Sequence, residues 1–270
     1  MSRQKLFDSH CHLHFSQFDN DREEIINRLK EAGIKVINVG TDLEDSKKAV
    51  ELSKEYPDFM WASIGLHPND NLEENFDIDK YRELAEFENV VAIGECGLDY
   101  FRIMNNELGI KEKQEKLFRA QLDLASELNK PLILHCRPSI GTQDAYEDVL
   151  HILNSYFIIH NSNLNGVAHF FAGSKETAEK FLDLGFYISF AGPITFAPEY
   201  REVVEFVPVD RILIETDAPF AAPAPHRGRR NEPTYVEFVA RKIAEWKRLS
   251  FEEVAEKTAE NAQKLFNIKY

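Results

Sequence analysis

Eight short segments rich in β-forming residues alternate with helix-length segments along the 270 residues of this chain. Such alternation predicts successive β-α-β units, whose strands pair in parallel within one sheet. Eight is the number of strands that closes a parallel sheet into a (β/α)8 TIM barrel, a fold of about 250 residues. We therefore predict an α/β barrel. Its strands are expected at residues 5–10, 36–40, 60–65, 90–94, 131–135, 166–170, 186–191 and 211–215.

Apolar residues recur at helical spacing in the segments between and after these strands. Ser174 and Ser250 each precede such a segment as N-cap residues, and Glu253 completes a capping box with Ser250. Residues 156–165 have the least regular pattern and are interpreted as a loop insertion. No linker divides the chain, so residues 1–270 are expected to form a single barrel domain. Helices are expected at residues 21–32, 43–55, 111–129, 175–184, 197–206, 233–248 and 251–266, the last being an additional C-terminal helix.

The composition excludes several classes of protein. Hydrophobic residues make up 43% and charged residues 29% of the chain, as in globular rather than disordered proteins. No stretch of about 18 apolar residues is present, and the N-terminus lacks the basic and apolar segments of a secretory signal. The three cysteines, Cys11, Cys96 and Cys136, lie in apolar segments, which indicates reduced, buried thiols. We expect a cytoplasmic protein without a membrane span, and nothing implies an obligate protein partner.

The charge balance limits how the chain could contact nucleic acid. Its formal net charge is −14 at pH 7. Non-specific binding to a duplex depends on many lysines and arginines that neutralise phosphates, so a broad surface of that kind is excluded. A nucleic-acid substrate would require a local basic site. The one dense cationic segment is residues 226–230, directly after the eighth predicted strand.

Polar side chains that can bind metals or move protons follow six of the eight predicted strands, always at the C-terminal end. In a barrel these ends meet at one mouth, where the βα loops build active sites. A packing role would scatter such groups over both ends, because buried unpaired charges are strongly unfavourable. The sequence therefore predicts a metal site at this mouth. The residues concerned are His10, His12, His67, Glu95, Asp99, His135, Arg137, His169, Glu215 and Asp217.

The types of ligand narrow the choice of metal. His10 and His12 are two residues apart on a strand, so their imidazoles point to the same side. Four histidines and two carboxylates suit Zn, Mn, Fe or Co better than an all-oxygen calcium site. Six protein ligands exceed what one tetrahedral catalytic ion needs, so two ions are predicted. Two cations about 3.5 to 4 Å apart can activate a water between them and stabilise both oxygens of a phosphoryl displacement.

The motifs at these strand ends resemble those of the TatD-type metal-dependent deoxyribonucleases of the amidohydrolase superfamily. They span nearly the whole chain in the family's order. The resemblance implies a TIM barrel, two divalent metal ions (Mg, Mn, Zn or similar) and phosphodiester hydrolysis on DNA, typically from the 3′ end. The matching motifs are Asp8-Ser9-His10-Cys11-His12-Leu13, Gly65-Leu66-His67-Pro68, Gly94-Glu95-Cys96-Gly97-Leu98-Asp99-Tyr100, Leu134-His135-Cys136-Arg137, Glu215-Thr216-Asp217-Ala218-Pro219 and Arg227-Gly228-Arg229-Arg230-Asn231-Glu232-Pro233.

The resemblance also implies roles for individual residues. Glu95 would bridge the two ions, and Asp217 would in addition take a proton from the attacking water. Glu215 shares a strand face with Asp217 and would order the site by hydrogen bonds; the alternative is a buried ion pair. His67 would touch substrate or a metal-bound water, or else cap its own loop. The implied ligands are His10, His12, Glu95 and Asp217 for one ion, and Glu95, His135 and His169 for the other.

Substrate contacts are expected from cations and aromatic rings near the mouth. Arg227 and Arg230 lie in the basic segment, and Arg137 faces the same way as His135. Arginine suits phosphate because its planar guanidinium donates two hydrogen bonds at once. Three aromatic residues could stack on the bases of a single strand, although core packing is an equal possibility for the last of them. They are Tyr100, Phe101 and Phe171.

Two segments depart from the family pattern. After His169 the chain has Phe170-Phe171-Ala172-Gly173 where the family usually has Cys-Phe-Ser-Gly, and after Arg137 it has Pro138-Ser139 in place of an acidic and a small residue. Neither change removes an implied metal ligand. Both bear on substrate preference.

The leading hypothesis is a divalent-metal-dependent deoxyribonuclease, a hydrolase acting on ester bonds, with 3′-5′ exonuclease activity and a preference for single strands or 3′ ends of DNA. A first alternative is another binuclear amidohydrolase-type hydrolase, although no lysine is placed to become the carbamylated bridge that many of those enzymes use. A second alternative is a nuclease or deacylase acting on RNA or aminoacyl-tRNA. A third is a metal-binding interaction protein that has lost turnover, which the complete ligand set and the retained Asp217 oppose.

Overall fold

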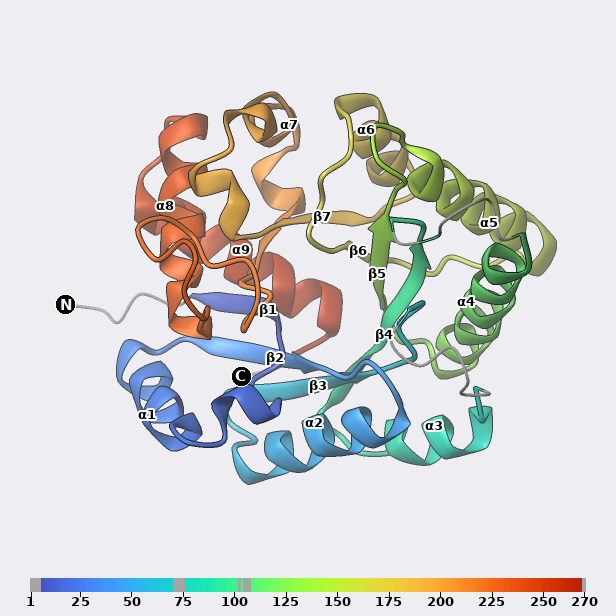
Figure 1. The fold of residues 1–270 in the computed structure, drawn as a ribbon, viewed down its shortest axis with the longest axis horizontal. Coiled ribbons are helices and arrows are strands. Elements are labelled where there is room, and N and C mark those ends of the chain that lie inside the picture. Colours follow the sequence, from blue (N-terminus) through green and yellow to red (C-terminus); the bar gives the residue numbers. More distant parts are fainter. Residues whose placement is uncertain (1–5, 70–75, 102, 104–107, 269–270) are drawn as a thin grey trace.

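Eight parallel strands pair in chain order and form the wall of a barrel (Figure 1). The structure is a computed structural model that describes residues 6–69, 76–101, 103 and 108–268. It confirms the predicted (β/α)8 architecture, and each predicted strand overlaps an observed one. The strands are β1 (Phe7–Cys11), β2 (Lys35–Val39), β3 (Met60–Ile64), β4 (Val90–Asp99), β5 (Leu132–Arg137), β6 (Gly166–Ala168), β7 (Tyr187–Phe190) and β8 (Ile212–Ile214).

The two ends of the sheet meet just beyond β8. Cys11 of β1 forms a parallel bridge with Ala218. The backbone N–H of Asp217 donates to the carbonyl of His10 over 2.9 Å, and that of His12 donates to the carbonyl of Ala218 over 2.7 Å. These bonds place a residue near the start of the chain beside one that lies some 200 positions later.

A buried carboxylate reinforces this closure. Asp8 of β1 is fully buried. It accepts hydrogen bonds from the backbone N–H of Thr216 (2.9 Å), the Thr216 hydroxyl (2.5 Å) and the backbone N–H of His10 (3.2 Å). Burial raises the pKa of Asp8 well above its usual range despite these donors. Asp8 therefore ties β1 to the segment that carries Asp217.

Removal of this carboxylate should destabilise the barrel. In Asp8→Ala, the buried donors of Thr216 lose their acceptor, so we expect the free energy of unfolding to fall by about 2–4 kcal/mol. Urea denaturation of the metal-free protein measures this loss. Asp58→Ala, a change at an exposed aspartate, is the matched control and should change it by less than about 0.5 kcal/mol. Equal stability of the two variants would contradict a closing role for Asp8.

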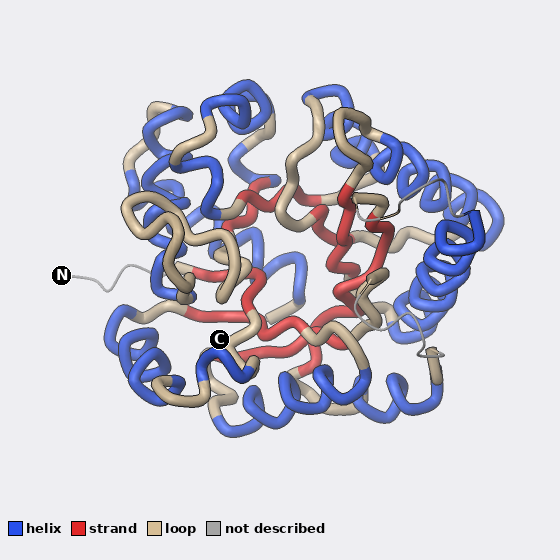
Figure 2. Tube along the Cα trace, in the orientation of Figure 1, coloured by secondary structure: helices blue, strands red, loops and turns tan. Residues whose placement is uncertain are grey.

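Helices surround the strands on all sides, as the blue ring around the red strands shows (Figure 2). The predicted capping box is confirmed, since Ser250 and Glu253 exchange both hydrogen bonds at the start of α9 (Phe251–Phe266). Ser174 likewise accepts from the backbone N–H of Thr177 at the start of α6. The helices are α1 (Arg22–Ala32), α2 (Leu43–Glu55), α3 (Ile78–Ala85), α4 (Leu108–Leu128), α5 (Asp144–His160), α6 (Lys175–Asp183), α7 (Arg201–Phe206), α8 (Val236–Lys247) and α9 (Phe251–Phe266).

The interpretation of residues 156–165 from the sequence was wrong. Residues 156–165 are not a loop insertion, because residues 156–160 form the last part of α5. Buried side chains recur at helical spacing from Val149 through Leu153 to Tyr156. The Tyr156 hydroxyl donates to Asp123 of α4 over 3.0 Å. The two exposed isoleucines that follow, Ile158 and Ile159, are what obscures the periodicity at this end.

The helix α9 closes one end of the barrel. A second apolar cluster, distinct from the layer between strands and helices, takes residues from every strand and from α9. Residues contributed by all eight strands can meet only inside the barrel, so α9 packs against its interior layer. The opposite end, where the strands have their carboxyl ends, is left for the functional site. The α9 members of the cluster are Ala259, Ala262, Leu265 and Phe266.

The three cysteines are buried free thiols, as the sequence predicts. The Cys11 sulfur lies 3.5 Å from the carbonyl of Ile37, and the Cys96 sulfur 3.7 Å from that of Ile133. Within the part of the chain that the structure describes, no helix combines the length and apolarity of a membrane span.

Candidate metal centre

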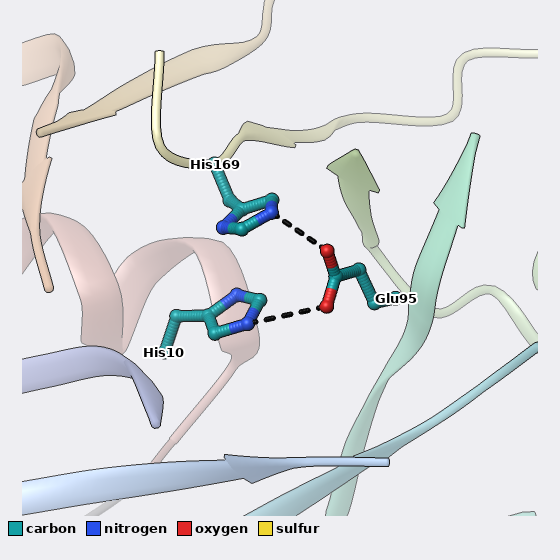
Figure 3. A group of neighbouring side chains, drawn as sticks. All are labelled: His10, Glu95 and His169. Carbon is teal, nitrogen blue, oxygen red and sulfur yellow. Dashed lines mark ion pairs between the residues drawn. The ribbon is translucent and has the colours of Figure 1, made fainter. Parts of the chain in front are cut away.

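Glu95 of β4 lies at the centre of a cluster of histidines. Its Oε1 atom is 2.6 Å from Nδ1 of His135, 2.8 Å from Nε2 of His169 and 3.7 Å from Nε2 of His67. Its other oxygen, Oε2, is 3.4 Å from Nε2 of His10. Figure 3 shows the carboxylate with His169 facing one oxygen and His10 facing the other. One carboxylate thus presents a different oxygen to each of two groups of nitrogen atoms.

The second group is completed by residues from the two ends of the chain. His10 and His12 project from β1 and the residues after it, with their Nε2 atoms 3.3 Å apart. The Oδ1 atom of Asp217 lies 3.5 Å from Nε2 of His12 and 3.7 Å from Nε2 of His10. The predicted convergence of the six ligand-type residues at one mouth is therefore what the geometry shows.

Hydrogen bonds fix which nitrogen atoms face the cluster. The carbonyl of Val39 accepts from Nδ1 of His12 over 2.7 Å, so the Nε2 atom of His12 presents its lone pair. Glu215 is fully buried and accepts from Nδ1 of His169 over 3.2 Å. The same contact fits both roles expected for Glu215, ordering of the site by a hydrogen bond and a buried ion pair. Bonds of this kind orient histidine ligands in metal sites.

Asp99 orients His135 by a hydrogen bond, as Glu215 orients His169. The position of Asp99 after a strand does not by itself indicate this role. Its Oδ2 atom accepts from Nε2 of His135 over 3.2 Å. The signal in the sequence is its position four residues after Glu95 on a strand that runs unusually far, from Val90 to Asp99. His67 is held by its own loop, because its Nδ1 atom accepts from the backbone N–H of Asn69 over 3.1 Å.

Asn231 was also not identified from the sequence. It is fully buried, and its side-chain amide donates to the carbonyls of Thr216 (2.8 Å) and Phe220 (2.7 Å). These two residues flank Asp217, whose φ of 56° lies in the left-handed region that side chains with a Cβ rarely adopt. Asn231 therefore holds the loop that presents Asp217.

Burial and neighbouring charges shift the pKa values of the candidate ligands in opposite directions. Burial lowers the pKa of His10 to about 4, so this imidazole is neutral at pH 7. Burial alone would raise the pKa of Glu95, but the facing His169, His67 and His10 hold it well below its usual range. Nearby carboxylates raise the pKa values of His12, His135 and His169 despite the burial of these rings, so these imidazoles have to lose a proton when a cation binds.

Among the described residues, three sets of donor atoms lie close enough to share an ion, and the atoms within each set are no more than 4.8 Å apart. Ring nitrogens and carboxylate oxygens of different residues lie close together in these sets, as the Nε2 atoms of His10 and His12 do at 3.3 Å, and a cation between them would bind both. The donor chemistry thus fits divalent metals that accept nitrogen and oxygen. The sets are His10, Glu95 and His169; His10, His12 and Asp217; and His67, Glu95 and His135.

The cluster opens into a cavity of about 450 Å³ at the carboxyl ends of the strands. Arg137 lines this cavity, with its guanidinium 3.9 Å from the ring of Phe101. The structure does not bring the other two arginines expected to contact substrate to the cavity. Arg230 pairs with Asp21 of the α1 N-terminus, and Arg227 lies over the ring of Phe196.

The aromatic residues at the mouth differ from those expected. Tyr100 is buried and donates its hydroxyl to Asp148 over 2.9 Å. Phe171 is buried against Tyr146, as the packing alternative foresaw. Phe101 is exposed beside Arg137. The aromatic rings that do line the cavity are Phe15, Phe170 and Phe220.

Comparison with known proteins agrees with this geometry. Residues 7–267 match the family described as TatD related DNase. The uncharacterized metal-dependent hydrolase YabD of Bacillus subtilis strain 168 is 45% identical over 267 residues, which are 97% of this chain and 99% of that protein. The 3′-5′ ssDNA/RNA exonuclease TatD of Pectobacterium parmentieri is 35% identical over 272 residues, covering 97% and 100%. The crystal structure of YJJV, a TatD homologue from Escherichia coli K12, has a TM-score of 0.86 at 30% identity and covers 98% of both chains.

Proposed function

The chain belongs to the TatD-related family of metal-dependent hydrolases, and from this premise we propose that it is a 3′-5′ exonuclease that hydrolyses DNA with a preference for single strands. The observation that carries the proposal is the Glu95 carboxylate, which offers one oxygen to each of two histidine groups, with Asp217 beside one of them. The Pectobacterium relative, a 3′-5′ ssDNA/RNA exonuclease, supports a nucleic-acid substrate.

We assign two divalent ions to the site, Mg, Mn, Zn or similar. His10, His12, Glu95 and Asp217 would hold one of them, and Glu95, His135 and His169 the other. When bound, the ions would supply positive charge for the developing phosphate charge and would activate water. Glu215 and Asp99 keep the rings of His169 and His135 in place through their hydrogen bonds.

Asp217 is the residue placed to accept a proton from the attacking water. Its side chain is 16% exposed and lines the cavity, whereas that of Glu95 is only 5% exposed. Water that enters the cavity therefore reaches Asp217 more readily. A carboxylate within hydrogen-bond reach of a nucleophilic water can act as its general base.

Arg137 is the residue placed to bind the phosphate. It extends from the end of β5 into the cavity that His135 also lines. Stacking of its guanidinium on Phe101 leaves the N–H groups at the edge of the plane free to donate to phosphate oxygens. Arg230 has its guanidinium occupied by Asp21, and Arg227 lies over the ring of Phe196 and does not line the cavity, which leaves phosphate binding to Arg137.

Loss of this arginine should weaken substrate binding more than it slows the reaction. In Arg137→Ala we expect KM for a single-stranded oligonucleotide to rise about tenfold, with kcat changed by less than about threefold, because one charge-assisted contact is removed. Steady-state kinetics at fixed ionic strength measures both constants. Arg241→Ala, which removes an exposed arginine of α8 paired with Glu237, should leave KM unchanged. A tenfold rise in both variants would show that only overall charge matters.

The proposed activity is tested on 5′-labelled oligonucleotides. Protein stripped of metal and then supplied with Mg, Mn, Zn or Co should shorten single-stranded DNA progressively from its 3′ end, and duplex DNA more slowly. An RNA oligonucleotide of the same sequence is included because the name of the relative covers both nucleic acids. Absence of cleavage with every metal between pH 6 and 9 would contradict the proposal, and internal cuts would replace exonuclease by endonuclease action.

A further inference from the structure

Three phenylalanine rings stand beside the candidate metal ligands in the cavity, those of Phe15, Phe170 and Phe220. Phe220 is 48% exposed. The edge of its ring meets Phe15 at a centroid distance of 6.3 Å, and Phe15 stacks on His12 at 4.6 Å. An apolar aromatic surface therefore extends from a candidate metal ligand to open solvent.

The backbone of Phe170 is fixed by the same residue that orients a histidine. Its φ of 44° lies in the left-handed region, and its N–H donates to Oε1 of Glu215 over 2.7 Å. The same oxygen accepts from Nδ1 of His169. The ring of Phe170 meets the His169 ring edge-on at 6.2 Å. Its position relative to the metal ligands is thus set by a buried carboxylate.

Phe220 is fixed in an equivalent way on the opposite group of ligands. Its N–H donates to the carbonyl of Asp217 over 2.8 Å, and its carbonyl accepts from the side chain of Asn231. The half-buried ring of Phe170 and the exposed ring of Phe220 are therefore both held on backbone that also carries or orients a candidate ligand. Such preorganisation lowers the conformational cost of binding a flat partner.

The charges in the cavity indicate what that partner is. Among the described residues that line it, Arg137 is the one lysine or arginine. One phosphate held by Arg137 and the metal centre would leave the attached group next to the rings. An aromatic base linked to a phosphate satisfies both parts of the cavity, and stacking on aromatic side chains is the usual way in which unpaired bases are bound.

We propose that Phe15, Phe170 and Phe220 form a stacking surface for the nucleobase next to the scissile phosphate. This inference rests on the proposed nuclease function and explains a preference for single strands, because a base paired in a duplex is not free to stack on protein. This surface takes the place of Tyr100 and Phe171, which were expected to bind bases but are buried.

The test compares two single-stranded DNA oligonucleotides that differ only at the 3′ end, one with a terminal adenine and one with an abasic nucleotide. The wild-type protein should favour the adenine by about tenfold or more in kcat/KM. Phe170→Ala and Phe220→Ala should each lower this preference by about threefold to tenfold, and the double variant should approach a ratio of one. Phe220→Leu, which keeps apolar bulk without a ring, should give an intermediate ratio.

Phe87→Ala is the matched control, since Phe87 is 40% exposed but lies outside the cavity; its ratio should equal that of the wild type. A wild-type ratio near one, or variants that slow both oligonucleotides alike, would overturn the stacking surface while leaving the nuclease function standing. A wild-type protein inactive on both oligonucleotides would contradict the nuclease function and the surface with it.

Discussion

Glu95→Gln is expected to reduce kcat on single-stranded DNA by at least about 10³-fold. The substitution keeps the shape of the side chain but removes the negative charge that both histidine groups share. Because nearby histidines hold the pKa of Glu95 well below its usual range, the wild-type carboxylate is ionised at every pH at which the assay runs. A neutral amide would not replace it as a ligand shared by the two proposed cations.

The same variant should also lose metal. We expect the metal content of Glu95→Gln, measured by mass spectrometry after dialysis against Mn²⁺, to fall to one ion per chain or fewer. Glu245→Gln, a change at an exposed glutamate of α8, serves as the control and should behave like the wild type. Activity within tenfold of wild type in Glu95→Gln would contradict the shared-ligand assignment.

Asp217→Asn is expected to lower kcat by about 10² to 10⁴-fold, the range associated with loss of a general base. The fold should survive, since Asp217 lies at the cavity and its backbone bond to His10 is retained. Steady-state kinetics and the urea midpoint together measure this combination. If the protein instead binds metal without catalysing a reaction, the wild type itself would be inactive, and the substitution would cause no loss of activity.

Asp210→Asn provides a matched control at the other end of the same strand. Asp210 lies two residues before β8 and is exposed, whereas Asp217 lies three residues after β8, at the mouth. Its kcat should stay within twofold of wild type. Retention of more than a tenth of the activity in Asp217→Asn would remove Asp217 from the role of proton acceptor.

The barrel and the ligand cluster could be predicted because one rule connects them. Parallel strands in a closed barrel place all their carboxyl ends at one mouth, so polar residues after separate strands must meet whatever their distance in sequence. His10 and Asp217 illustrate this, since the pairing of β1 with the segment after β8 brings them within 3.7 Å. Predicting that these residues meet required only the order of the strands and the direction of alternate side chains along each strand.

Other features depend on contacts between loops, which local spacing does not encode. The basic segment after β8 was expected at the cavity, but Asp21 at the start of α1 binds Arg230, and an ion pair across 209 positions leaves no periodic signal. The aromatic lining shows the same limit. Phe171 is buried in the core, whereas the preceding residue, Phe170, lines the cavity. Both lie in the segment after His169 that departs from the family pattern.

The central claim is that the Glu95 carboxylate is shared by two cation sites. The most direct measurement is an anomalous diffraction map of crystals equilibrated with Mn²⁺. It should show two peaks, one between Glu95, His10, His12 and Asp217 and one between Glu95, His135 and His169. A single peak at saturating Mn²⁺, or two peaks of which only one contacts Glu95, would contradict the account.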